Sequence, residues 1–138
     1  MGFNVGVIAD ILKFPWPLFP KYKYIYHQGE RFDIPALIQD FEFTISLPAN
    51  NKYELLSIAF ASTGYKDGDS FSLRLNDKVI LNKIYTKELG QAKQIQPVRK
   101  IDSSQDTLTF IYHNTTGTSK VIWVDFDLTS QKEINEGG

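Results

Sequence analysis

The chain has 138 residues, the usual size of one globular domain, which leaves little room for a second core. Its 15 basic and 16 acidic residues nearly balance, and no cluster of Lys and Arg stands out, so we expect no nucleic-acid partner. The sequence contains no cysteine, which excludes disulfides, thiolate metal sites and cysteine nucleophiles.

Targeting signals are also lacking in this sequence. There is no run of about 18 apolar residues that would form a transmembrane helix. The start has neither the basic segment nor the small-residue cleavage site of a signal peptide. Gly2 follows Met1, but position 6 is Gly6 rather than the Ser or Thr of a myristoylation motif. We therefore expect synthesis in the cytoplasm and no membrane insertion.

Residues 1–20 differ from the rest of the chain, and we expect them to form an irregular or short-helical N-terminal arm. The sequence FPWPLFP ends the arm, and its three prolines cannot donate to a central sheet. Phe14, Trp16 and Phe19 would form an exposed apolar patch unless they pack against something. The arm is therefore predicted to contact either its own domain or a neighbouring subunit.

The strand patterns begin after the arm. Tyr22 to His27 and Phe32 to Ile34 flank Gln28-Gly29-Glu30, which predicts a loose hairpin. Residues 41–47, FEFTISL, alternate strictly between apolar and polar side chains, which is typical of a half-buried strand.

Strands and turns then follow each other along the chain. The run YELLSIAFAS at 53–62 is apolar enough for a buried strand. The alternating SFSLRL at 70–75 leads through Asn76-Asp77 into KVILNKIY at 78–85, which predicts a hairpin.

The next segment carries two further signals. TKELGQAK at 86–93 is the stretch expected to form a helical turn, with Thr86 as its N-terminal cap. Pro97 predicts that residues 94–101 form an edge strand or a loop with a short extended end, because proline cannot donate to a central ladder.

Two strands close the chain, TLTFIYH at 107–113 and KVIWVDFDL at 120–128. The total of seven or eight short strands without long intervening helices predicts an all-β fold, an antiparallel β-sandwich or jelly roll, over residues 21–130. The tail at 131–138 is expected to fray. Alternation within the strands predicts a core of inward-facing side chains: Phe43, Ile45, Leu73, Leu75, Phe110, Tyr112, Ile122, Val124 and Phe126.

The titratable residues give little support to catalysis. His27 and His113 each lie in a predicted strand beside aromatic residues, where a half-buried polar role is the commoner one. Asp125 and Asp127 share one strand face, whereas the paired carboxylates of glycosidases face each other across a cleft. We therefore expect a non-enzymatic protein with no catalytic residue, no metal and no cofactor.

Two short motifs have simpler explanations as turns. The segment 66–70, KDGDS, resembles part of a calcium loop but lacks the further ligands and the distal Glu, so calcium is not expected to be required. Asn114-Thr115-Thr116 is a glycosylation sequon, but such triplets are frequent in turns.

From Tyr53 to Thr129 the sequence resembles small β-sandwich modules of bacteriophage virions. The residues that carry this are GDSFSLRLNDKVILN, TLTFIYHNTTGTSK and VIWVDFDL, short strands joined by Asp, Asn, Gly and Thr turns without cysteine. The family comprises tail, baseplate and receptor-binding pieces, which are similar in turn to carbohydrate-binding jelly rolls. The resemblance implies a structural or host-contact role in an oligomeric particle, located in the virion after synthesis in the host cytoplasm.

We therefore expect a non-enzymatic virion or assembly protein that associates with itself or with other virion proteins through its arm. The alternative is a carbohydrate-binding module whose exposed aromatic side chains stack on a glycan, since aromatic residues make up 14% of the chain. A small glycan-active enzyme is a third possibility. A flat row of exposed aromatics would favour sugar binding, and a cleft with two facing carboxylates would favour the enzyme.

Overall fold

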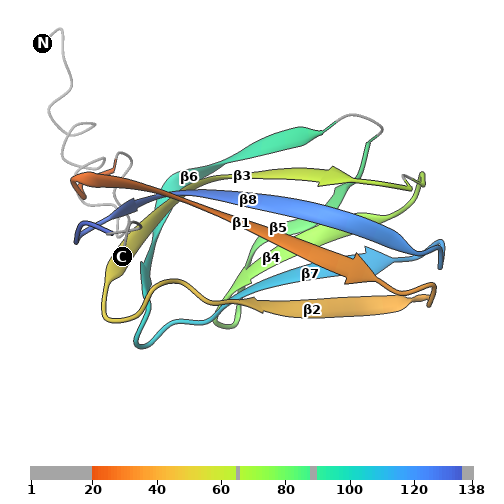
Figure 1. The fold of residues 1–138 in the computed structure, drawn as a ribbon, viewed down its shortest axis with the longest axis horizontal. Helices are drawn as coiled ribbons and strands as arrows, with labels where there is room; N and C mark the ends of the chain where they lie inside the picture. Colours follow the sequence, from red (N-terminus) through yellow and green to blue (C-terminus); the bar gives the residue numbers. More distant parts are fainter. Residues whose placement is uncertain (1–19, 65, 88–89, 135–138) are drawn as a thin grey trace, which may run out of the picture.

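The computed structural model describes residues 20–64, 66–87 and 90–134, which form two antiparallel sheets of four strands, packed face to face (Figure 1). The all-β sandwich expected from the sequence is confirmed. No helix in these residues is long and apolar enough to cross a membrane. The strands are β1 (Tyr24–Ile34), β2 (Gln39–Ile45), β3 (Lys52–Ser62), β4 (Ser70–Leu75), β5 (Lys78–Tyr85), β6 (Gln91–Asp102), β7 (Leu108–Asn114) and β8 (Lys120–Ser130).

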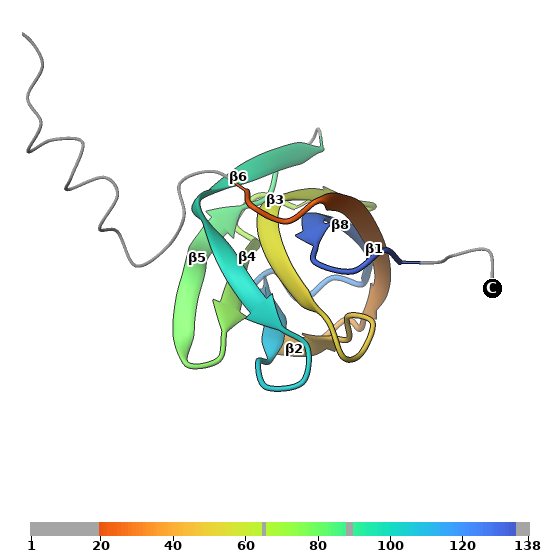
Figure 2. The same ribbon diagram turned by 90° about the vertical axis from the view of Figure 1, so that its left-hand side faces the viewer.

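The strands pair as one long antiparallel hairpin that has been rolled up. β1 pairs with β8, β2 with β7, β3 with β6 and β4 with β5. Two further pairings complete a first sheet of order β1-β8-β3-β6 and a second sheet of order β2-β7-β4-β5. This pairing of eight strands in two sheets is a jelly roll. One open side of the sandwich therefore lies between the edge strands β1 and β2, and the other lies between β5 and β6 (Figure 2).

Side chains from the inner faces of both sheets fill the core. Phe60 of the first sheet stacks on Phe71 of the second, with ring centroids 4.7 Å apart. All the predicted core residues are buried except Phe43 and Leu75, which are partly buried and pack against the core. Phe43 lies on the edge strand β2 and stacks on Phe32 of β1 at 4.0 Å, so these two rings close one open side of the sandwich.

The predicted hairpin around Gly29 is wrong. β1 runs without a break and pairs with β8 along its whole length, with Gly29 opposite Asp125. A Cβ atom at Gly29 would lie 2.9 Å from the Asp125 Oδ1 atom. Glycine is therefore used here for a close approach of a side chain within a strand, and not for a turn.

The predicted helical turn at 86–93 is also wrong. β6 already begins at Gln91, and residues 88–89 lie outside the described residues. Instead of capping a helix, Thr86 donates from its backbone N–H and its hydroxyl to the carbonyl of Asp69, at 2.9 and 3.2 Å. The edge strand expected around Pro97 is confirmed, because β6 is the outer strand of its sheet and its register with β3 shifts there.

The core assignment predicts the effect of removing a buried ring. Phe126 is fully buried, so Phe126→Ala should lower the free energy of unfolding by about 3–5 kcal/mol. Trp123→Ala is the matched control, because Trp123 lies on the same strand, faces outward and is 40% exposed. Denaturant unfolding of both variants checks this. An equal loss in the two variants would contradict the assignment of the faces of β8.

Candidate functional site

The arm residues Phe14, Trp16 and Phe19 lie outside the described residues, and so do residues 135–138. Their predicted contact role therefore stays a prediction. What the structure does place is the point where the arm meets the sandwich, just before β1.

Glu54 fixes that point. Its Oε1 atom accepts hydrogen bonds from the backbone N–H groups of Lys21 and Tyr22, each at 2.8 Å. The same oxygen accepts the hydroxyl of Thr129 at 2.8 Å, and Glu54 is fully buried. These hydrogen bonds hold Lys21 and Tyr22, the residues that follow the arm, in a fixed position on the sandwich.

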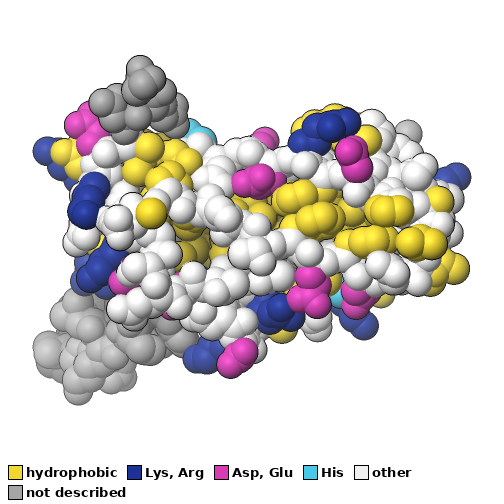
Figure 3. Space-filling view, turned by 60° about the horizontal axis from the view of Figure 1, so that its bottom comes forward, with side chains coloured by type: hydrophobic (Ala, Val, Ile, Leu, Met, Phe, Trp, Pro, Cys, Tyr) yellow, Lys and Arg dark blue, Asp and Glu magenta, His cyan; other side chains and the backbone are white. Residues whose placement is uncertain are grey.

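An apolar strip follows the open side between β1 and β2 and continues into the loop that joins them. In the loop, Leu37 and Ile38 are 53% and 75% exposed. Figure 3 shows hydrophobic side chains along this side of the molecule and at its right-hand end, where this loop lies. We call this surface the edge strip, and it consists of Phe32, Pro35, Ala36, Leu37, Ile38, Phe41 and Phe43.

The two aspartates of β8 lie on the outer face of the first sheet, as predicted. Asp127 links three neighbouring strands, because its Oδ1 atom is 2.6 Å from His27 Nδ1 on β1 and its Oδ2 atom accepts the Ser57 hydroxyl of β3 at 2.8 Å. Asp125 stands beside it on the same strand face rather than across a cleft. Among the described residues, no group of three or more His, Cys, Asp or Glu gathers to hold a metal ion.

A shallow groove of about 340 Å³ lies next to Asp125 on the same face. Trp123 forms one wall, and small side chains line much of the rest. The Gln91 Oε1 atom is buried and has no hydrogen-bond partner within residues 20–64, 66–87 and 90–134. The exposed aromatics of these residues are Trp123 and Tyr85, which lie on different sheets, so they do not form the flat row that would have favoured sugar binding.

His113 lies in a chain of hydrogen bonds on the outer face of the second sheet. Its Nδ1 atom is 2.8 Å from Asp40 Oδ1, and its Nε2 atom is 2.8 Å from Ser72 Oγ. The same atoms are paired in Ser-His-Asp triads. Ser72, however, is only 4% exposed, and its oxygen already accepts the backbone N–H of Lys83 at 2.9 Å. The chain of bonds therefore braces all four strands, from β5 through β4 and β7 to β2.

The end of the sandwich beside the β1–β2 loop contains a buried ion pair. Lys120 Nζ is 2.8 Å from Asp69 Oδ2, and both side chains are fully buried. Thr116 donates to Asp69 Oδ1 from its backbone N–H and from its hydroxyl, each at 3.0 Å. Burial raises the pKa of Asp69, but the bonds from Lys120 and Thr116 outweigh it and hold that pKa below its usual value.

This ion pair explains both turn motifs. Asp69 belongs to the calcium-like segment, and its two oxygens are already bound to Lys120 and Thr116. Asn114, the sequon residue, is fully buried and accepts from Lys120 Nζ at 2.6 Å. Its side-chain amide donates to the carbonyls of Pro35 and Leu37, at 3.1 and 2.9 Å. The folded protein therefore offers no free amide for a glycan, and the same amide anchors the loop of the edge strip.

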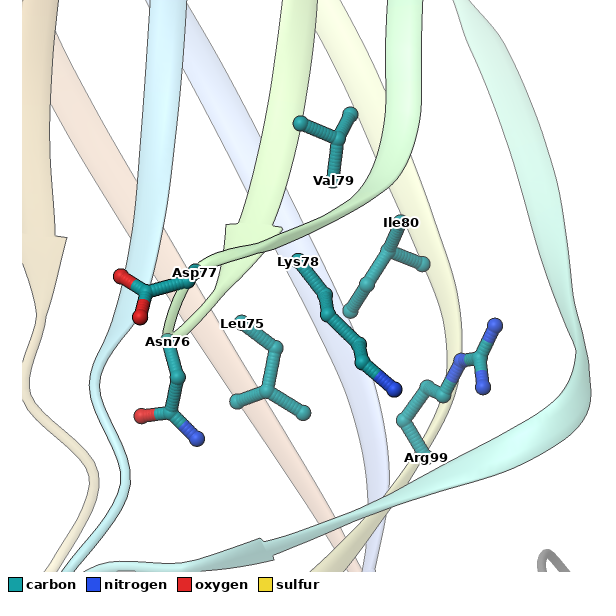
Figure 4. Close-up of a pocket in the computed structure, with 7 residues that line it drawn as sticks. All are labelled: Leu75, Asn76, Asp77, Lys78, Val79, Ile80 and Arg99. Atoms are coloured by element: carbon teal, nitrogen blue, oxygen red, sulfur yellow. The ribbon is translucent and has the colours of Figure 1, made fainter.

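The other open side of the sandwich, between β5 and β6, holds a cavity of about 430 Å³ beside the β4–β5 turn (Figure 4). Leu75, Val79 and Ile80 provide an apolar lining. Lys78 from β5 and Arg99 from β6 also line this cavity, and they come from opposite sheets.

Residues 23–133 match a protein family described as a domain of unknown function (DUF8551). No curated protein matches the sequence.

The buried ion pair gives a stability prediction. Lys120→Met leaves the Asp69 carboxylate buried without its cation, and removing one partner of such a pair typically costs about 3–5 kcal/mol. Adding Asp69→Leu should recover part of that loss, because the remaining charge is then removed as well. Denaturant unfolding measures both, with the exposed Lys100→Met as the control. A Lys120→Met variant as stable as the control would contradict the role of the pair.

The pair also predicts a pH dependence. In the unfolded chain the Asp69 pKa is about 3.9, and in the folded protein it is lower. The contribution of this group to stability is therefore fully present above about pH 4 and is lost as the pH falls through the folded pKa. Asp69→Asn should flatten this acid dependence when unfolding is measured from about pH 6 to pH 2. If the free energy of unfolding of the Asp69→Asn variant fell with acid as steeply as that of the wild type, Asp69 would not be the source of the pH dependence.

Proposed function

The chain belongs to the DUF8551 family, and we propose that it is a non-enzymatic assembly module of the kind found in bacteriophage virions, whose arm docks on a neighbouring copy. The observation that carries this proposal is the edge strip. Four consecutive apolar residues, 35–38, are exposed at the end of the sandwich, and the strip continues between β1 and β2. Monomeric proteins rarely leave such a continuous apolar surface uncovered, and large exposed patches mark interaction sites.

The dimensions of β1 support contact of the arm with the loop of a neighbouring copy rather than with the loop of its own chain. The loop of the edge strip and the base of the arm lie at opposite ends of β1 (Figure 1), which at about 3.3 Å per residue spans roughly 33 Å. Phe14 lies six residues before Pro20, and a fully extended chain of that length reaches roughly 22 Å at most. The aromatic residues of the arm therefore do not reach the loop of their own chain. A neighbouring copy can bring its loop to them.

This arrangement supports a head-to-tail mode of assembly. The donor, the arm, and the acceptor, the loop of the edge strip, lie at opposite ends of one domain. An interface between two different surfaces is heterologous and produces closed rings or open filaments. Aromatic anchors flanked by proline lose little conformational entropy on docking, and each fully buried ring contributes roughly 1.5–3 kcal/mol.

A mixing experiment tests the docking. The donor-defective variant carries Phe14→Ser, Trp16→Ser and Phe19→Ser in the full chain, and the acceptor-defective variant carries Leu37→Asp and Ile38→Asp. Each is expected to be monomeric by light scattering, because every contact needs one arm and one edge strip. An equimolar mixture should form heterodimers and nothing larger, since only one intact contact can form.

The controls separate docking from folding. Ile25→Asp, an exposed apolar position outside the edge strip, should assemble like the wild type. Removal of residues 1–20 should leave the circular dichroism spectrum of a folded sandwich but weaken self-association. An unfolded truncation would place the arm in the core of its own domain. A mixture that stays monomeric, or single variants that assemble normally, would overturn the proposal.

The groove beside Trp123 supports a second candidate function, recognition of a sugar ring. We propose that an apolar face of a pyranose stacks on Trp123 while its hydroxyls donate to the two oxygens of the Asp125 carboxylate. The site supplies acceptors, so it suits a ligand that brings several donors.

Tryptophan fluorescence during titration with a panel of neutral mono- and oligosaccharides tests this candidate. Trp123→Ala should weaken binding by about tenfold or more, the scale of one ring-stacking contact. Because the Trp123→Ala variant lacks the fluorescent reporter, its binding is followed by calorimetry. Tyr85→Ala, which removes an exposed aromatic side chain from the other sheet, is the control. Saccharide binding that survives Trp123→Ala would exclude this assignment. Tighter binding of choline, a cation that also stacks on aromatic rings, than of every saccharide would exclude it as well.

A further inference from the structure

We propose that a pocket beside the loop of the edge strip seats the indole ring of Trp16 from a neighbouring copy. The inference rests on the proposed assembly and names one contact within it. The pocket has a volume of about 360 Å³, at the lower end of the range for small-ligand sites. Pro35 belongs both to the edge strip and to the wall of this pocket, so the two surfaces are continuous.

Three strands of the first sheet build the pocket at the end where β1 and β3 finish and β8 begins (Figure 1). Asp33 on β1 and Val121 on β8 are paired neighbours. Thr63 follows β3, and its hydroxyl accepts the backbone N–H of Val121 at 3.0 Å. Hydrogen bonds of the sheet therefore hold the walls in place, and a preformed pocket costs an entering ring little reorganisation.

The lining of the pocket combines apolar walls with one carboxylate. Pro35 and Val121 provide apolar surface for the face of a ring. The side chain of Asp33 is 73% exposed and has a loose ion pair with Arg31 at 3.4 Å, so its oxygens can accept a further hydrogen bond. Among the three aromatic anchors of the arm, Trp16 alone carries an N–H donor, and a buried indole usually donates. The pocket therefore suits Trp16 better than the two phenylalanines.

The arm of the same chain is too short to reach this pocket. Lys21 is bound to Glu54 near the start of β3, and Thr63 follows the other end of that strand. At about 3.3 Å per residue, these two positions on β3 are roughly 30 Å apart. Trp16 lies five residues before Lys21, a length of roughly 18 Å at most when fully extended. The ring that enters the pocket therefore comes from a second copy.

A double-mutant cycle tests the contact, with the self-association of the full chain measured by light scattering across a range of concentrations. Trp16→Phe keeps a ring but removes the N–H, and Asp33→Ala removes the acceptor. Each should weaken self-association by about tenfold, because each breaks the same charge-assisted hydrogen bond. The double variant should be no weaker than either single variant, since the bond is broken only once. Asp77→Ala removes an exposed carboxylate outside the pocket and should leave self-association within about twofold.

The fluorescence of Trp16 reports its burial directly. The chain has two tryptophans, so Trp16 alone emits in a Trp123→Phe background. On assembly its emission should shift to shorter wavelength and its quenching by acrylamide should fall, because the indole leaves water. Adding Leu37→Asp and Ile38→Asp, which remove the acceptor surface of the edge strip, should abolish both changes.

The outcomes separate this inference from the assembly proposal. A wild-type chain that stays monomeric would overturn both. A chain that assembles without a change in the emission of Trp16 would overturn the seat of the ring and leave the assembly proposal in place. The same holds if the effects of Trp16→Phe and Asp33→Ala add up in the double variant, because the two groups then make no bond with each other.

Discussion

The buried ion pair between Asp69 and Lys120 fixes the end of the jelly roll on which the assembly proposal depends. Two charges withdrawn completely from water are tolerated only as a pair with further hydrogen bonds, so residues before β4 and at the start of β8 must meet at one place. Asn114 joins this network and holds the carbonyls of Pro35 and Leu37. The apolar side chains of the edge strip are therefore presented by an anchored loop.

The period of two in the sequence was sufficient to predict the sandwich and the faces of most strands, because half-buried strands must alternate. It was insufficient at Gly29, where the sequence signal of a turn is the same as that of a close contact with Asp125 on a partner strand. Thr86 likewise has the sequence of a helix cap but is bound to the Asp69 carbonyl. In both cases a contact distant in sequence decides the local structure, and no local pattern contains it.

The candidate sites also differ in whether they lie within one segment of the sequence or join segments that are far apart. The run at 35–38 stands in the sequence as four apolar residues followed by Gln39 and Asp40, but the sequence does not show that it is exposed, because a short apolar run is equally typical of a buried segment. The cavity beside Arg99 and the hydrogen bonds of His113 join strands far apart in the chain, so spacing alone could not reveal them. The role of the arm, with Phe14, Trp16 and Phe19, remains a prediction from composition.

The rolled-up topology leaves two open sides, and different kinds of side chain line them. Apolar rings and the exposed loop lie between β1 and β2, whereas the cavity between β5 and β6 is lined by both apolar and charged side chains. The central claim is that the first of these surfaces is covered by another copy of the chain. The mass of the full-length protein by light scattering, measured across a range of concentrations, tests it most directly. We predict a mass that is a multiple of 15.8 kDa and falls on dilution, and a mass of 15.8 kDa at every concentration would contradict self-association.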